Sequence, residues 1–465
     1  MKVGRPWTVL APLGVSALLI GWVAMSAANA QAATFSLLVY ALANLIVYTD
    51  ALDFLLRLYV CRRNTAAATM TDNNRDLSID LGATSGDASL VVPVHPYAIV
   101  ASIFNLEENL DEFMELYQQH RERVWLISDG STDNTVKRLR QAGWRCIDEP
   151  TNRRKPAALQ QLIARLPPHI ETIMVIDPDI VIREVGNGSS VDLDRAIGDF
   201  QRSGAAAMCP RVMIDPDGYL ARFQAFEYAL AFRVGRASLA DYSITSGVSI
   251  YRRDALITAL QVHSHSVYAE DLENALILLS LGERVYHDGR LVVSTEGPGS
   301  VKRWFSQRVG WYHGLLKVYS QRFREIWRVS KRSPFAFYHF IIYLGGLSLA
   351  LHVVKVVSAL LLLISFVSGF DALFATGGLT HTAITNPVNF IAAIGSYLAL
   401  GVVALFVIVP RAERAYIAPI VPLYLFYAIA HIVPMTVGFL NWIWLQIFGR
   451  RVFQDHYEVM QESKI

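Results

Sequence analysis

Residues 172–179 read TIMVIDPD, an apolar run that ends in two aspartates separated by one proline. Residues 172–176 have the length and the apolar content of a buried β-strand. Similar apolar runs occur at residues 97–103 and 124–127, and patterns typical of helices, such as the apolar face within 109–119, alternate with them. The middle of the chain is therefore predicted to form an α/β domain with a mainly parallel sheet.

Polar side chains follow each of these predicted strands. Asn105 and Glu107 follow the first, Asp129 to Asp133 follow the second, and Asp177 and Asp179 follow the third. Ligands of open α/β sheets bind beyond the carboxyl ends of the strands. The sequence therefore predicts one functional site at this edge of the sheet.

The pair Asp177 and Asp179 predicts a metal site. Two carboxylates two residues apart can address one divalent cation, and oxygen ligands suit Mg²⁺ or Mn²⁺. Such a cation would neutralise a diphosphate as it leaves. The same pattern recurs at Asp215 and Asp217, but we interpret that copy as a turn because no comparable strand precedes it and Gly218 follows.

Other candidate residues have alternative interpretations at this stage. Asp129 can accept hydrogen bonds from a base or ribose, although Thr132 or Asp133 beside it would serve as a helix N-cap. Lys155 opens a helix with Pro156 in its first turn, where it would bind an anion or face solvent. Trp311 would anchor at a bilayer interface or stack on a sugar ring.

The order of these motifs resembles that of membrane-integrated family 2 glycosyltransferases, the group that includes cellulose, chitin and hyaluronan synthases. The resemblance covers residues 96–314, together with the flanking helices. It rests on Asp129, on Asp177-Pro178-Asp179, on Glu270-Asp271, and on the segment from Gln307 to Trp311. It implies a GT-A, Rossmann-like mixed sheet inserted between N-terminal and C-terminal transmembrane helices.

The resemblance also implies roles. Asp129 and Asp177 would bind the donor nucleoside with help from Asn105 and Lys155, and Asp179 would bind the metal. Asp271, next to Glu270, would be the general base that deprotonates an acceptor hydroxyl. Attack opposite the leaving diphosphate gives inversion. The acceptor or the diphosphate would be held by Gln307, Arg308 and Trp311.

Three positions depart from the family pattern. Ser128 stands where another aspartate is frequent, Asn105-Leu106-Glu107 replaces an Asn-Glu pair, and Gly310 stands where arginine is expected. The predicted function is transfer from a nucleotide-sugar, such as a UDP-sugar, to a growing β-linked polysaccharide. Gly310 favours the alternative, addition of a single sugar to a membrane lipid. A third hypothesis is a catalytically inactive assembly subunit, which the intact acidic motifs disfavour.

The ends of the chain predict membrane segments. The chain has 465 residues, 53% of them hydrophobic, and a mean hydropathy of +0.32. Apolar runs at 9–30 and 35–60 are long enough to span a bilayer, although residues 1–30 also resemble a signal peptide. Residues 415–448 contain His431 and Pro434 near their middle, which suggests a hairpin of two short crossings. Asp50 and Asp53 lie near Arg57 at the cytoplasmic end of the second run.

Basic clusters flank these runs, so the inside-positive rule places the middle domain in the cytoplasm. We predict about six spans, with five as the alternative, in the cell inner membrane. The expected domains are two transmembrane helices in 1–61, a flexible linker in 62–94, a cytoplasmic catalytic domain with interfacial helices in 95–333, three to four transmembrane helices in 334–449, and a cytoplasmic tail in 450–465.

The remaining composition limits the partners. The formal net charge is +2, which gives no indication of nucleic acid binding. Three cysteines, Cys61, Cys146 and Cys209, have no metal-ligand spacing and fit a reducing compartment. The expected partners are a nucleotide-sugar donor, a carbohydrate or lipid acceptor and membrane lipids, with export or regulatory subunits as further candidates.

Overall fold

The computed structural model describes residues 45–71, 95–183, 192–215, 217–264, 268–374 and 387–449. The described residues form two compact units. The α/β unit contains the described residues from 61 to 303, and the helical unit contains residues 45–60 and those from 304 to 449. The predicted first span, most of the linker and the C-terminal tail lie outside the described residues.

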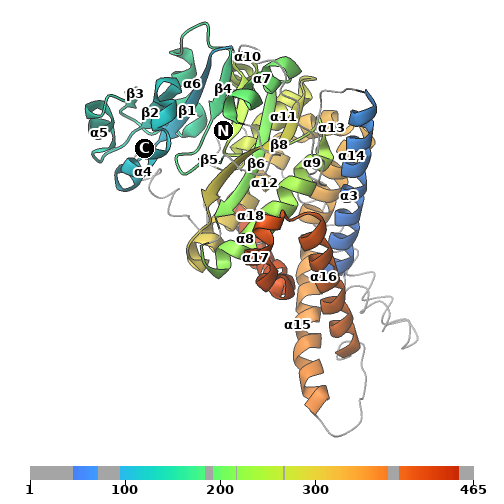
Figure 1. The fold of residues 1–465 in the computed structure, drawn as a ribbon. Helices are drawn as coiled ribbons and strands as arrows, with labels where there is room; N and C mark the ends of the chain where they lie inside the picture. Colours follow the sequence, from blue (N-terminus) through green and yellow to red (C-terminus); the bar gives the residue numbers. More distant parts are fainter. Residues whose placement is uncertain are drawn as a thin grey trace. The chain divides into compact units, whose positions relative to one another are not determined.

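The α/β unit is built on an eight-stranded mixed sheet with the order β3-β2-β1-β4-β7-β6-β8-β5. Strands β3, β2, β1 and β4 are parallel and lie side by side in Figure 1. Strand β7 runs antiparallel to β4 and β6, whereas β8 runs parallel to β6. The strands are β1 Tyr97–Ile103, β2 Val124–Asp129, β3 Cys146–Glu149, β4 Thr172–Val175, β5 Val181–Arg183, β6 Ala207–Asp215, β7 Ser249–Arg252 and β8 Val285–Glu296.

The three apolar runs become the neighbouring strands β1, β2 and β4, as predicted. Nearly every residue of β1 and β4 is buried, which is expected of central strands covered on both faces. Because β4 and β6 both run antiparallel to β7, the carboxyl ends of β1, β2, β4 and β6 lie along one edge of the sheet. The polar clusters after these strands therefore share that edge.

Short helices connect the strands, and their ends differ from the predicted ones in two places. The helix expected over 109–119 is α4 Leu110–Leu116, followed by a 3-10 turn. The next helix begins at Thr135 rather than at Thr132 or Asp133, because the Asp133 carboxylate accepts the Thr135 N–H at 3.0 Å. The other helices are α5 Thr135–Gln141, α6 Lys155–Ala164, α7 Leu193–Ser203, α8 Gly218–Leu230, the π-helix η3 Ala231–Arg236, α9 Ala237–Leu239, α10 Arg253–Val262 and α11 Glu270–Ser280.

The pair Asp215 and Asp217 was interpreted as a turn because no strand was expected before it, and this reason is wrong. A nine-residue strand, β6, precedes it and ends at Asp215. The Asp215 carboxylate is bound by the Arg183 guanidinium at 2.9 Å and by the Ser294 hydroxyl at 3.0 Å. Asp215 thus joins β6 to β5 and β8.

The helical unit contains part of α3 Leu45–Thr71. This helix includes residues 62–71, so the first ten residues of the predicted flexible linker are helical. The other elements of the unit are α12 Val301–Gln321, which begins in the α/β unit, α13 Phe323–Ser330, α14 Pro334–Phe337, the π-helix η4 Tyr338–Ala350, α15 His352–Phe374, α16 Pro387–Val407, α17 Arg411–Ile417, the 3-10 helix η5 Ala418–Leu423 and α18 Tyr424–Phe448. Helices α15 and α16 contact one another.

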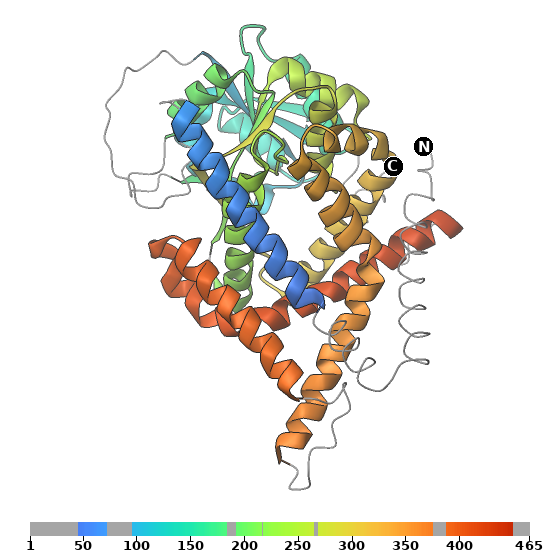
Figure 2. The ribbon, with the colours of Figure 1, turned by 90° about the vertical axis from the view of Figure 1, so that its right-hand side faces the viewer.

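The predicted hairpin over 415–448 is wrong. Pro434 lies inside α18, which Figure 2 shows in red as one uninterrupted helix. Among the described residues, Arg411–Phe448 is long and apolar enough to cross a membrane. Pro334–Ala350 and His352–Ile364 pass the same test together but bend by 57°, and Ile394–Val407 is apolar but shorter.

The acidic residues of α3 are paired within the helical unit. The Arg57 Nε donates to both oxygens of Asp53 at 2.8 Å, and the Tyr338 hydroxyl donates to Asp53 at 2.9 Å. The Tyr397 hydroxyl donates to Asp50 at 3.0 Å. These contacts join α3 to η4 and α16.

Candidate active site

Asp129 ends β2 and is bound to the loop that follows β3. Its Oδ1 accepts the Arg153 N–H at 2.7 Å, while burial raises its pKa against the lowering effect of this and the neighbouring N–H. Gly130 turns the chain with φ +78°, and a Cβ there would lie 2.6 Å from the Asn152 nitrogen. Only glycine allows this approach of the two backbones.

Asn105 and Glu107 support the loop after Asp129. Asn105 Oδ1 accepts the Thr132 N–H at 2.8 Å. The Glu107 carboxylate accepts the N–H and the side-chain amide of Asn134 at 2.9 and 2.8 Å, and these bonds lower its pKa. Asn105 and Glu107 thus stabilise the loop after Asp129 through hydrogen bonds. The contact of Asn105 with a donor stays a prediction.

Lys155 connects two of the predicted motifs. Its Nζ donates to Asp177 Oδ1 at 2.6 Å and to Glu270 Oε1 at 3.3 Å. Burial lowers the pKa of Lys155, but the nearby carboxylates of Asp177, Glu270 and Asp271 outweigh it and raise the pKa well above its usual value. The interpretation of Lys155 as a solvent-facing lysine is therefore wrong, and its ammonium is held charged between the two acidic motifs.

Asp179 is the second aspartate of its motif and is oriented by β8. Its Oδ2 accepts the Thr295 hydroxyl at 2.6 Å. Burial raises the pKa of Asp179, and the like charge of Asp177 raises it further. Within the described ranges, no three His, Cys, Asp or Glu side chains are arranged to hold a metal. The carboxylates of Asp177 and Asp179 are oxygen ligands of the kind that Mg²⁺ takes, and such a cation completes its coordination with oxygens of phosphates and water.

The backbone at Gly247 lies directly against Asp177. A Cβ on Gly247 would be 2.1 Å from Asp177 Oδ2. The same segment is fixed by Arg236, whose guanidinium donates to the Thr245 carbonyl at 2.9 Å. Thr245 in turn donates its hydroxyl to the Asp271 carbonyl at 2.7 Å. Residues 245–247 thus connect the Asp177 motif to the start of α11.

Asp271 lies in the first turn of α11, where it is partly buried. Burial, and then the charge of Glu270, raise the pKa of Asp271 to about 8. The same turn is fixed by Glu273, whose fully buried carboxylate accepts the N–H and the hydroxyl of Ser264 at 3.0 and 2.5 Å. His263 Nε2 lies 3.4 Å from that carboxylate and 3.3 Å from the Glu270 carbonyl. A raised pKa suits a carboxylate that exchanges a proton near neutral pH.

Backbone strain accumulates next to these residues. Four non-glycine residues among those described have positive φ, and three of them are Asn105, Arg154 and Ala269. Arg154 precedes Lys155, and Ala269 precedes the pair Glu270-Asp271. Left-handed backbone at non-glycine residues is costly and concentrates at functional sites.

Gln307, Arg308 and Trp311 lie on α12 in the helical unit, whereas the acidic residues lie in the α/β unit. The Arg308 guanidinium lies 4.2 Å from the centre of the Trp311 ring. The Gln307 Oε1 is buried and has no hydrogen-bond partner among the described residues, which suggests a ligand contact. Gly310 is buried, and the α12 backbone beside it packs against Gly438, where a Cβ would lie 2.9 Å from the Val309 carbonyl.

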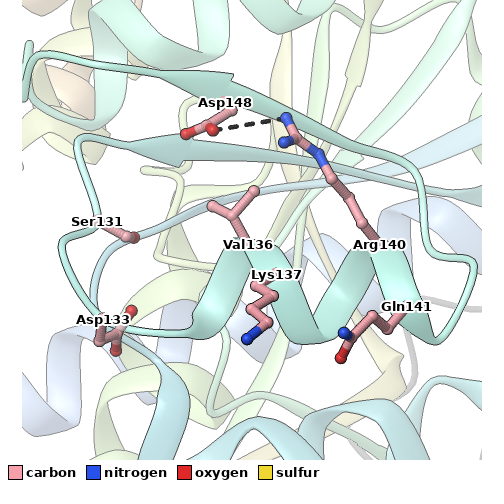
Figure 3. A pocket seen from close by; sticks show the side chains of 7 residues that line it. All are labelled: Ser131, Asp133, Val136, Lys137, Arg140, Gln141 and Asp148. Carbon is pink, nitrogen blue, oxygen red and sulfur yellow. Dashed lines mark ion pairs between the residues drawn. The ribbon is translucent and has the colours of Figure 1, made fainter.

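A hollow of about 450 Å³ lies beside α5 and β3, on the outer side of the loop after Asp129. Figure 3 shows its lining and the ion pair of Arg140 with Asp148, at 3.5 Å. The lining residues are Ser131, Asp133, Val136, Lys137, Arg140, Gln141 and Asp148. Ser131 and Asp133 of the predicted polar cluster line it, whereas Asp129 does not.

The sequence analysis assigned no contact with the acidic residues to Arg236, Thr245, Gly247 or Thr295. Gly247 lies against Asp177, and Thr295 donates to Asp179. Thr245 donates to the Asp271 carbonyl, and Arg236 donates to the Thr245 carbonyl.

The mixed sheet, with its acidic residues gathered at one edge, defines a GT-A-like glycosyltransferase fold. Residues 98–184 match the family model described as glycosyl transferase family 2. With this match, the protein is a glycosyltransferase that carries a family 2 segment over β1 to β5. No curated protein matches the chain.

Solved structures give weaker similarities. One is a mannosyltransferase from Pyrobaculum calidifontis in complex with GDP-Man and Mn²⁺, with 15% identity, 87% of this chain and 99% of that chain covered, and a TM-score of 0.49. Another is glucosyl-3-phosphoglycerate synthase from Mycobacterium tuberculosis in complex with Mn²⁺ and UDP-glucose, with 14% identity, 48% and 78% covered, and a TM-score of 0.32.

Proposed function

We propose that the protein is an inverting, metal-dependent glycosyltransferase that moves a sugar from a nucleoside diphosphate donor, a UDP-sugar, to a growing β-linked polysaccharide at the membrane. The observation that carries this proposal is the position of Lys155. Its ammonium contacts Asp177 and Glu270 at the same time, so the donor motif and the proposed base lie beside one another.

The donor would bind at the edge where β2 and β4 end. Asp129 and Asp177 would hold the nucleoside, with Asn105 assisting, and Lys155 would contact the diphosphate. Asp179 would bind Mg²⁺ or Mn²⁺. The Thr295 hydroxyl donates to the Asp179 carboxylate at 2.6 Å and orients it. A bound cation supplies charge neutralisation for the departing diphosphate.

Asp271 would act as the general base. It takes a proton from the acceptor hydroxyl while the hydroxyl oxygen attacks the anomeric carbon, and the bond from that carbon to the diphosphate breaks. Its raised pKa makes the carboxylate a stronger base than an ordinary aspartate. Glu270 would keep that pKa high and orient Lys155.

The acceptor would be held by Gln307, Arg308 and Trp311. The half-exposed Trp311 ring, with the Arg308 guanidinium on its face, suits stacking against a sugar. A second candidate function, transfer of one sugar to a membrane lipid, is favoured by Gly310. A buried glycine offers a growing chain no cationic contact at the position where the family pattern has arginine.

The membrane part of the proposal is a multi-pass protein of the cell inner membrane with its catalytic domain in the cytoplasm. Support comes from the apolar helix Arg411–Phe448, from the bent pair before it, and from the apolar run at 9–30. Because α18 is one helix, the proposal has five spans rather than six. Three crossings after a cytoplasmic catalytic domain would place the tail at 450–465 outside, so the proposal does not keep the predicted cytoplasmic tail.

The experiment is a donor screen on the purified full chain with Mn²⁺ or Mg²⁺ and radiolabelled nucleotide-sugars, followed by sizing of the product. The proposal expects a product longer than one sugar that disappears in Asp271→Asn and persists in the matched control Asp148→Asn, an exposed aspartate on β3. A product of one sugar in lipid extracts would favour the second function. Absence of both transfer and donor hydrolysis with every donor would point to the inactive subunit.

A further inference from the structure

Helix α13 exposes a row of aromatic and basic side chains in the helical unit. Ile326 and Val329 are fully buried on one face of the helix. Phe323 and Trp327, four residues apart, are 43% and 42% exposed on another face. Lys331 continues this row, with its Nζ 5.0 Å from the centre of the Trp327 ring.

Two further features enlarge this row into a patch. Phe337, in α14, is 38% exposed, and its ring centre lies 6.4 Å from that of Trp327. The Arg324 and Arg328 side chains are exposed beside the row. We call Phe323, Arg324, Trp327, Arg328, Lys331 and Phe337 the aromatic–basic patch.

The charge around the patch is strongly positive. Residues 322–332 contain five basic residues and one acidic residue, Glu325, and therefore carry a formal charge of +4. The whole chain carries +2, so the rest of the chain is net negative. Glu325 lies 3.7 Å from Arg322 and is only 24% exposed, so it does little to offset the patch.

The position of the patch along the chain indicates its partner. It directly precedes the apolar pair Pro334–Ala350 and His352–Ile364, where a polar segment gives way to apolar helices. Tryptophan prefers the headgroup level of a bilayer, and clustered Lys and Arg next to apolar helices attract anionic headgroups. From this combination we infer that the aromatic–basic patch is a binding surface for anionic phospholipid headgroups of the membrane.

The aromatic–basic patch contains none of the acidic residues of the proposed reaction. Each basic residue near an anionic surface strengthens the attraction roughly five-fold, so the three exposed cations together favour anionic over neutral lipid on the order of 100-fold. Trp327 would then be enclosed by anionic lipids even in a mixed bilayer.

The test is tryptophan quenching on the full chain in nanodiscs, with bromine on the acyl chains of either phosphatidylglycerol or phosphatidylcholine in the same mixture. The chain has nine tryptophans, so the Trp327 signal is the difference between the wild type and Trp327→Phe. We expect brominated phosphatidylglycerol to quench Trp327 about twice as strongly as brominated phosphatidylcholine, since binding enriches it locally.

The triple variant Arg324→Gln/Arg328→Gln/Lys331→Gln should remove this preference. The control Lys137→Gln/Arg140→Gln/Arg195→Gln neutralises three exposed basic residues of the α/β unit and should keep it. Equal quenching of Trp327 by the two lipids in the wild type, or a preference that survives the triple variant, would overturn the inference. The inference rests on the membrane part of the proposed function. The quenching readout requires no catalysis, so a failure of the proposed reaction would leave it unchanged.

Discussion

The close approach of Gly247 to Asp177 makes Gly247→Ala a sharp test of the donor site. A Cβ at this position would lie 2.1 Å from Asp177 Oδ2 and 3.2 Å from its Cγ, whereas Cβ contacts do not fall below 3.0 Å. The carboxylate or the backbone must therefore move by about 0.9 Å, the difference between the first and last of these distances. Asp177 cannot turn away without lengthening its 2.6 Å bond to Lys155.

Displacement of a positioning group by about 1 Å can cost on the order of 100-fold in rate. We expect Gly247→Ala to lower kcat/KM for the donor by about that factor, with the fold retained, because one side chain can absorb the shift. The assay is steady-state transfer or donor hydrolysis, with thermal unfolding measured in parallel. Gly299→Ala is the control, since a Cβ there meets nothing within 4 Å. Activity of Gly247→Ala within about threefold of that of Gly299→Ala would refute the reasoning.

Further predictions concern the base, the metal and the turn. Because a base works deprotonated and the pKa of Asp271 is raised to about 8, turnover should rise with pH up to about that value. Glu270→Gln removes a like charge, so the rising limb of the pH–rate profile should move to lower pH, and an unmoved limb would contradict the assignment. Thr295→Val removes the hydrogen bond to Asp179 and should raise the Mn²⁺ concentration for half-maximal activity roughly tenfold, whereas Asp179→Ala should abolish the response to metal. Gly130→Ala should destabilise the fold by at least about 1 kcal/mol, from its left-handed backbone alone, and an unchanged Tm would contradict this.

The sequence predicted, from its apolar strands, that Asp129 and Asp177 would lie at one edge of the sheet. The apolar runs of β1, β2 and β4 are readable because central parallel strands are buried on both faces and so contain few polar residues. Their parallel pairing then brings Asp129 and Asp177 to one edge. Local sequence was sufficient to place Asp129 and Asp177, because each lies at or just after the end of an apolar strand.

Contacts between distant elements were not predictable in this way. Lys155 and Glu270 are 115 residues apart, and Asp179 and Thr295 are 116 residues apart. Their pairing depends on the antiparallel insertion of β7 between β4 and β6, which no periodicity in the chain reveals. The predicted hairpin over 415–448 was wrong for another reason. A proline in an apolar segment suggests a break, yet neighbouring helices can support a continuous helix around Pro434.

The double contact of Lys155 has a consequence for how this protein can change over evolution. Because one ammonium serves both Asp177 and Glu270, a substitution at either carboxylate alters the electrostatic surroundings of the other. Mutational effects at the two positions should therefore be epistatic rather than additive, with coupling of about 0.5–3 kcal/mol in a double-mutant cycle. A lineage that acquires a new donor through changes near Asp177 would first need a compensating change near α11, which restricts the order in which such substitutions can accumulate.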